Sequence, residues 1–118
     1  MLSVLEEHEF PFPVKRIFWI TNTQSLAFRG QHAHMDGWQF LIPISGHAII
    51  KSFGPGLDRK RFDLRDKAYG LIVPPLHWLD IRITLSETNL LVLASNPYSE
   101  NDYIRSWEEY EKLVSPVQ

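Results

Sequence analysis

The sequence contains no cysteine, so disulfide bonds and zinc sites built from thiolates are excluded. An excess of charge of one sign is also missing, because 12 Lys and Arg stand against 14 Asp and Glu, with a formal net charge of −2. This balance gives no electrostatic case for binding nucleic acid or an anionic membrane. No apolar run approaches the roughly 20 residues that a membrane-spanning helix needs.

Residues 1–7 lack the basic region and the long apolar region of a secretory signal peptide, so we do not expect one here. The chain has 118 residues, of which 44% are hydrophobic, and this is enough for one hydrophobic core. We therefore expect a single domain over residues 1–118, located in the cytoplasm.

Short runs rich in branched and aromatic residues follow one another along most of the chain, separated by turn residues. Runs of this composition predict β-strands. Their number and spacing predict an all-β fold, an antiparallel jelly-roll sandwich or barrel. The runs cover residues 14–20, 26–34, 38–44, 47–53, 61–64, 69–73, 78–85 and 90–94.

The last part of the chain has a helical pattern. Ser99 and Asp102 have the spacing of a capping box, in which both side chains bond backbone N–H groups at the start of a helix. The residues that follow at helical period are Tyr103, Trp107, Tyr110 and Val114. We expect a C-terminal amphipathic α-helix that packs these side chains against the outside of the barrel, with Arg105 in a surface or interface pair.

The segment from Arg29 to His34 is the most informative stretch of the sequence. His32 and His34 are two residues apart on an extended run, so both imidazoles face the same side of the strand. Two histidines inside a barrel can bind a metal, transfer protons, or do both. His8 and His47, which stand alone, are expected to be structural.

The spacing from His32 through Gln39 to Gly46 resembles the first cupin motif, in which a glutamate usually stands at the position of Gln39. The second cupin motif falls on residues 74–79, where Leu79 replaces the usual ligand histidine. A catalytic metal site needs three or more good donors, and a neutral amide is a poor substitute for a carboxylate. His77 could supply a third ligand, but the metal interpretation is the weaker one.

Further blocks extend this resemblance over nearly the whole chain, in order. They resemble the dTDP-4-keto-6-deoxyglucose 3,4-ketoisomerases, small cupin enzymes of deoxysugar biosynthesis. The blocks are Val14-Lys15-Arg16-Ile17-Phe18, Arg29-Gly30-Gln31-His32-Ala33-His34, Gly70-Leu71-Ile72-Val73, Pro75-Leu76-His77-Trp78, and Leu93-Ala94-Ser95 through Asp102-Tyr103-Ile104-Arg105.

The resemblance implies a metal-free, cofactor-free dimeric jelly roll that binds a dTDP-linked keto-deoxysugar in its barrel and moves the ketone from C4 to C3. The chain departs from the family at three positions. Trp19 stands where the family carries a tyrosine near the sugar, Met35 replaces a lysine, and Leu79 replaces a histidine. Compared with the family, this sequence begins within the segment that reads Leu2-Ser3-Val4-Leu5-Glu6-Glu7 here.

Proton transfer is the chemistry that suits the histidine pair. The C4 ketone acidifies the C3 proton, and imidazole titrates near neutral pH, as a base for this step should. His32 and His34 are therefore the predicted catalytic residues. They could serve C3 and C4 respectively, or one could polarise an oxygen while the other carries the proton.

Five residues are predicted to bind the substrate. The planar, permanently charged fork of Arg29 suits a diphosphate, and Gln39 can bond sugar oxygens or fix a histidine tautomer. The remaining predicted contacts are Trp19, His77 and Trp78, although Trp78 is equally suited to the core.

Two other functions stay open beside the isomerase. One is a non-catalytic or altered nucleotide-sugar-binding cupin, and a more distant one is a metal-dependent oxygenase. We also expect a homodimer, because the runs 14–20 and 38–44 are apolar on both faces and such sheets tend to be covered by a partner.

Overall fold

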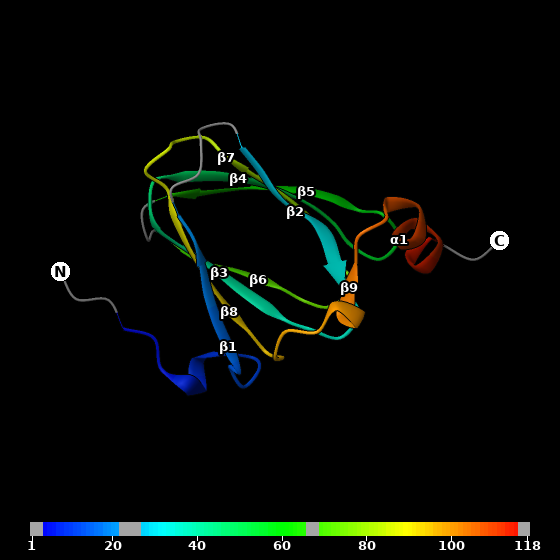
Figure 1. The fold of residues 1–118 in the computed structure, drawn as a ribbon, viewed down its shortest axis with the longest axis horizontal. Helices are drawn as coiled ribbons and strands as arrows, with labels where there is room; N and C mark the ends of the chain where they lie inside the picture. The colour runs from blue at the N-terminus through cyan, green and yellow to red at the C-terminus, as the bar shows by residue number, and fades with distance from the viewer. Residues whose placement is uncertain (1–3, 22–26, 66–68, 116–118) are drawn as a thin grey trace.

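The structure is a computed structural model that describes residues 4–21, 27–65 and 69–115. Two antiparallel sheets face each other, and Figure 1 places the helix α1 beyond one end of them. The elements are η1 (Glu7–Glu9), β1 (Arg16–Ile20), β2 (Ala27–His34), β3 (Gln39–Ser45), β4 (His47–Phe53), β5 (Arg59–Arg65), β6 (Leu71–Val73), β7 (Trp78–Ile83), β8 (Asn89–Ala94), η2 (Glu100–Asp102), β9 (Tyr103–Ile104) and α1 (Trp107–Val114).

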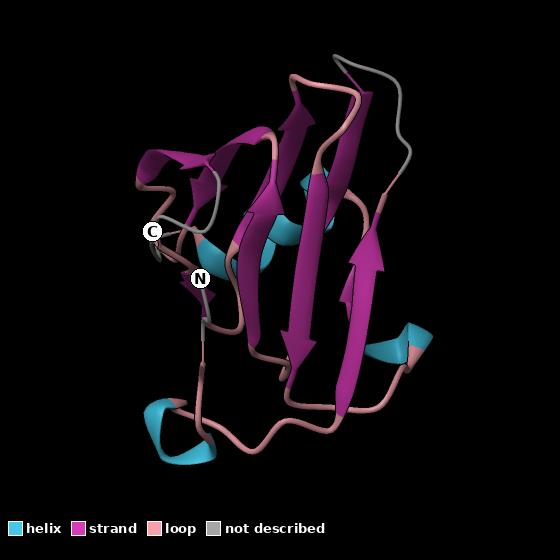
Figure 2. Cartoon of the chain, turned by 90° about the vertical axis from the view of Figure 1, so that its left-hand side faces the viewer, coloured by secondary structure: helices cyan, strands magenta, loops and turns pink. Residues whose placement is uncertain are grey.

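The first sheet has the strand order β1-β8-β3-β6, and the second has the order β5-β4-β7-β2-β9. Neighbours in these orders are mostly far apart in sequence, as in a jelly roll. Figure 2 shows the long strands lying side by side. The predicted antiparallel β fold with a C-terminal α-helix is confirmed.

The core lies between the two sheets and follows the alternation of strand side chains. Along β8 the even-numbered residues are buried, and along β4 the buried positions Ala48, Ile50 and Ser52 face the same interior. The largest cluster of buried apolar side chains is Leu41, Ala48, Ile50, Leu64, Val73, Leu79, Ile81, Ile83, Leu90 and Val92. This cluster leaves one end of the barrel to polar groups.

The predicted start of the C-terminal helix is wrong. Ser99 precedes a short 3₁₀ turn and makes no side-chain capping bond, and residues Tyr103–Ile104 form β9, which pairs with β2. The α-helix begins only after Ser106, whose Oγ accepts a hydrogen bond from the N–H of Glu109. The spacing of Tyr103 and Ile104 favours a helix, but their pairing with β2 places them in a strand, because tertiary contacts override local propensity.

Helix α1 packs against the outside of the barrel, as predicted, at the end of the second sheet. Tyr110 is fully buried, its ring lies 5.6 Å from that of Trp78, and its hydroxyl lies within 2.8 Å of the carbonyl oxygens of Phe53 and Leu76. Trp107 stacks edge-on against Trp78, with ring centroids 5.3 Å apart. This packing fixes the end of the second sheet that carries the histidine pair.

His47 lies away from the histidine pair and is tied into the sheet. Its ring nitrogens lie 2.5 Å from Thr84 Oγ1 and 3.0 Å from a carboxylate oxygen of Asp63, which agrees with the structural role expected of it. His8 is exposed on the N-terminal segment.

In the part of the chain that the structure describes, no helix has both the length and the apolar character required to cross a membrane.

Candidate functional site

The histidine pair lies at the end of β2, after an irregularity in the strand. Gln31 has a φ of 42°, and the pairing with β7 shifts register between Gly30 and His32. A bulge of this kind re-aims the side chains that follow it. After the bulge, His32 is paired with Leu79, and the ring centroids of His32 and His34 lie 5.0 Å apart. The predicted placement of both imidazoles on one side of the strand is correct.

Tyr103 completes this group from β9. It is the register partner of His34, and its ring centroid lies 4.9 Å from His32 and 4.4 Å from His34. The prediction that Tyr103 packs a helix against the barrel is therefore wrong. Arg105, over the Tyr103 ring at 4.3 Å, forms an exposed ion pair with Glu100, which is the surface pair expected of it.

Both ring nitrogens of His34 have a partner. Nδ1 lies 2.8 Å from Oδ2 of Asp102, and Nε2 lies 3.1 Å from the amide nitrogen of Gln39. A carboxylate only accepts hydrogen bonds, so Nδ1 carries the proton, and the lone pair of Nε2 accepts from the amide of Gln39. These two contacts define one neutral tautomer.

Burial lowers the pKa of His34 below its ordinary value of 6.5. The hydrogen bond and the charge of Asp102 act in the opposite direction and raise this pKa, whereas the charge of Arg16 lowers it further. A histidine whose pKa is lowered in this way is chemically suited to act as a neutral base near neutral pH.

Asp102 is part of this network rather than a helix cap. Its second carboxylate oxygen accepts a hydrogen bond from the backbone N–H of Asp36 at 2.7 Å, and its carbonyl accepts one from Met35 at 2.8 Å. The residue thus fixes the turn after β2 and orients His34 at the same time. Sequence spacing gave Asp102 a capping role because it could not show that η2 lies beside β2.

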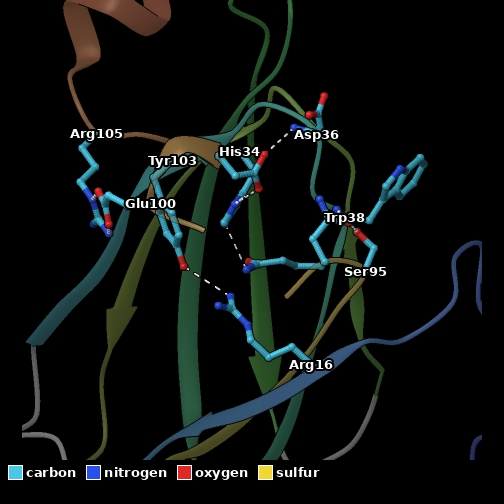
Figure 3. A network of polar contacts seen from close by, with 11 residues as sticks. Arg16, His34, Asp36, Trp38, Ser95, Glu100, Tyr103 and Arg105 are labelled. Carbon is cyan, nitrogen blue, oxygen red and sulfur yellow. Dashed lines mark hydrogen bonds and ion pairs between the residues drawn. The ribbon is translucent and has the colours of Figure 1, made fainter. Parts of the chain in front are cut away.

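Arg16 reaches the same group from β1, on the other sheet. Its Nη2 donates to the hydroxyl of Tyr103 at 3.4 Å, and Figure 3 shows the guanidinium pointing from β1 toward that hydroxyl. Its carbon Cζ lies 4.8 Å from the ring centroid of Phe18 and 5.5 Å from that of Tyr98. The sequence singled out Arg16 only as part of a matching block, not as a site residue.

The other predicted contacts are placed differently. Gln39 is buried at the start of β3 and contacts His34, as the predicted role in fixing a tautomer requires. Trp19 is 66% exposed on the outer face of β1, away from the barrel interior. Trp78 packs under α1, on the opposite face of β7 from Leu79. The structure does not bring either tryptophan to the histidine pair.

His77 lies beside a separate cavity of about 300 Å³, lined also by Ser52, Lys60 and Phe62, and its Nδ1 bonds the carbonyl of Pro75 at 3.0 Å. Arg29 lies in β2 and pairs with Ile81 of β7, and its side chain lies outside the described part of the structure. Within residues 4–21, 27–65 and 69–115, no three His, Cys, Asp or Glu side chains converge as metal ligands.

The chain matches the family described as WxcM-like, C-terminal (FdtA) over residues 1–115. It is 30% identical over 117 residues to the TDP-4-oxo-6-deoxy-alpha-D-glucose-3,4-oxoisomerase of Aneurinibacillus thermoaerophilus, covering 99% of this chain and 84% of that protein.

Similar crystal structures come from the same kind of enzyme. The sugar 3,4-ketoisomerase QdtA of Thermoanaerobacterium thermosaccharolyticum, in complex with TDP, has a TM-score of 0.87 at 33% identity, with 95% of this chain and 81% of that chain covered. A 3,4-ketoisomerase of Helicobacter canadensis has a TM-score of 0.87 at 34% identity, with 97% and 85% covered. With the family match, the shared fold and the predicted resemblance in agreement, this chain belongs to the FdtA family of WxcM-like, C-terminal proteins, among the sugar 3,4-ketoisomerases.

Proposed function

We propose that this protein is an isomerase of deoxysugar biosynthesis that moves the ketone of a dTDP-4-keto-6-deoxyhexose from C4 to C3. The observation that carries the proposal is the convergence of His32, His34 and Tyr103, with both histidine rings within 5.0 Å of the tyrosine ring. The family supports the substrate class, because a histidine-to-asparagine mutant of QdtA was solved in complex with TDP-4-keto-6-deoxyglucose.

The reaction is an internal redistribution of two protons. A base removes the proton from C3, and the electrons of the C–H bond form a C3–C4 double bond while the negative charge develops on O4. The resulting enediolate transfers a proton between O3 and O4. Protonation of C4 then leaves the ketone on C3. No electron leaves the substrate, so the step needs no redox cofactor.

His34 is suited to be the base. Because Asp102 holds the proton on Nδ1, Nε2 carries the lone pair, and the amide of Gln39 occupies it until the substrate takes that place. The ring of His32 lies 5.0 Å from that of His34, which supports a role for His32 at the sugar oxygens. We assign proton abstraction to His34 and proton transfer at oxygen to His32.

We also propose that the reaction needs no metal. The carbonyl itself acidifies the C3 proton, and the ring nitrogens of His34 are engaged by Asp102 and Gln39. Leu79, the register partner of His32, offers no ligand where a cupin metal centre has a histidine.

The first prediction tests the activity and its metal requirement together. Protein treated with a chelator should convert dTDP-4-keto-6-deoxyglucose to a 3-keto sugar at the untreated rate, with deuterium from heavy water entering the carbon skeleton, as NMR would show. A protein that binds the sugar without exchange would be the non-catalytic binder. Loss of rate on chelation, restored by one transition metal, would contradict metal independence.

The second prediction concerns the two histidines. Replacing His32 or His34 with Asn should lower kcat by at least the ~10²-fold typical of lost acid–base catalysis, with the fold retained. His8→Asn is the matched control, because His8 is exposed on the N-terminal segment, and it should keep the wild-type rate. Full activity in both site variants, with melting curves unchanged, would remove the histidines from the mechanism.

The third prediction concerns pH. Burial lowers the pKa of His34 below 6.5, so the proposed base becomes protonated only at a pH below 6.5. The fall of kcat/KM on the acid side of the pH profile should therefore have its midpoint below 6.5. Asp102 opposes this shift, so Asp102→Asn should move the limb to still lower pH while reducing the rate, since the tautomer is no longer fixed.

Steady-state rates between pH 4 and pH 9 would measure both effects. Glu108→Gln, on the exposed side of α1, should leave the pH profile unchanged. An acid limb above 6.5 in the wild type, or a limb that rises in Asp102→Asn, would contradict the assignment of His34 as the base.

We further propose that the protein forms a homodimer through the outer face of the first sheet. Two rows of side chains that run across the strands on this face are apolar throughout. Four of these side chains come from β1 and β8, and each of the four is exposed or half-buried. The rows are Ile17, Leu93, Phe40 and Ile72, and Trp19, Leu91 and Ile42. A continuous apolar sheet face fits the same face of a second copy across a two-fold axis.

The fourth prediction tests this face. Trp19→Glu places a charge at the β1 end of one apolar row and should convert a dimer to a monomer, measured by light scattering at micromolar concentration. Leu113→Glu is the control, because Leu113 is similarly exposed, at 55%, but lies on α1. A wild-type monomer, or a variant that stays dimeric, would contradict the proposed interface.

A further inference from the structure

Arg16 is a partly buried cation without a counter-ion in the described part of the chain. None of the ion pairs among these residues includes it, and its hydrogen bond to the hydroxyl of Tyr103 is long, at 3.4 Å. Its Nε is a buried donor with no hydrogen-bond partner. A buried donor on a charged group costs free energy unless a partner satisfies it, so this nitrogen points to a ligand acceptor.

The position of Arg16 puts that acceptor in the reaction site. Arg16 pairs with Ala94 in β8, and Ala94 pairs with Gln39 in β3, so Arg16 and Gln39 stand in one row across the first sheet. Arg16, His34, Gln39 and Tyr103 line the same narrow cavity at the end of the barrel. An acceptor that reaches Arg16 there is also within the group that transfers protons.

The guanidinium is held in place before any ligand arrives. The rings of Phe18 and Tyr98 lie 4.8 Å and 5.5 Å from its carbon, and the hydroxyl of Tyr103 accepts from Nη2. Donors fixed in this way stabilise developing charge without the cost of reorganising during the reaction. Asp102 lines the same cavity, but its two oxygens bond His34 and the N–H of Asp36, and it forms no ion pair with Arg16.

We propose that Arg16 binds the substrate oxygen on which the negative charge of the enediolate develops, first O4 and then O3. The inference rests on the ketoisomerase function proposed above and adds a catalytic residue to it. As the C3–H bond breaks, the charge that appears on O4 accepts hydrogen bonds from the fork of Arg16. After the proton moves from O3 to O4, the same fork holds the charge on O3, and C4 takes a proton as the C3 ketone forms.

The competing role is binding of the diphosphate, and affinity for TDP separates the two. TDP contains the nucleotide and the diphosphate but lacks the reacting sugar. If Arg16 holds the reacting oxygen, Arg16→Met should lower kcat about 10²- to 10³-fold, the usual effect of removing an oxyanion donor, with TDP affinity unchanged by calorimetry. The deuterium exchange at C3 should fall with kcat.

The pH profile gives a readout that a structural role would not move. The charge of Arg16 lowers the pKa of His34, so its removal should shift the acid limb to higher pH. Lys15→Met is the matched control, because it removes the same charge one residue away on the exposed side of the chain, and it should keep kcat, TDP affinity and pH profile. Arg16→Lys keeps the cation and should recover part of the rate lost in Arg16→Met.

The following outcomes would overturn the inference. A weaker affinity of Arg16→Met for TDP with kcat retained would assign Arg16 to the diphosphate. Wild-type rates in Arg16→Met, or a lysine variant as slow as a methionine variant that remains folded, would remove the charge from the mechanism. If Arg16→Met does not fold, the lysine variant decides, since wild-type kcat in it would exclude a role for the planar fork. A wild-type protein that does not isomerise the sugar would reject the proposed function and this inference together.

Discussion

The carboxyl group of Asp102 is the contact on which the rest of the site depends. One oxygen holds Nδ1 of His34 at 2.8 Å, the other holds the N–H of Asp36, and the carbonyl of the same residue holds Met35. These bonds join the end of β2 to the η2–β9 segment. Gly37 makes the approach possible, because a Cβ at that position would lie 2.7 Å from Oδ2 of Asp102. The orientation of the His34 ring is thus set by a chain segment 68 residues away in the sequence.

Most of the strands could be predicted from the sequence. A strand that is buried on one face alternates apolar and polar residues with a period of two, and this pattern can be recognised without tertiary information. The C-terminal region failed where two local signals competed. Ser99 and Asp102 have capping spacing, but so do Ser106 and Glu109, and only the second pair begins the α-helix. Pairing of Tyr103 and Ile104 with β2 decides between them, and no local pattern contains that pairing.

The site was predicted where its residues are neighbours on one strand and missed where the fold brings strands together. His32 and His34 follow from alternation along β2. Tyr103 and Arg16 join them from β9 and β1, and their place becomes visible only in the register. Tryptophan is a residue type that often binds sugars, but Trp19 lies on the outer face of β1. Side chains alternate along this strand, and Arg16 is on the inward side, so Trp19, three residues later, faces outward.

A glutamine rather than a carboxylate at position 39 sets the chemistry of this barrel. Its amide donates to Nε2 of His34, which leaves the proton on Nδ1 beside Asp102. A carboxylate there would accept instead, draw a proton onto Nε2 and raise the pKa of the histidine, which would turn a neutral base into an imidazolium. It would also give Arg16, in the same cavity, a counter-ion. In the proposed reaction Gln39 would keep His34 basic and leave the charge of Arg16 for the substrate, whereas a carboxylate would favour a bound cation.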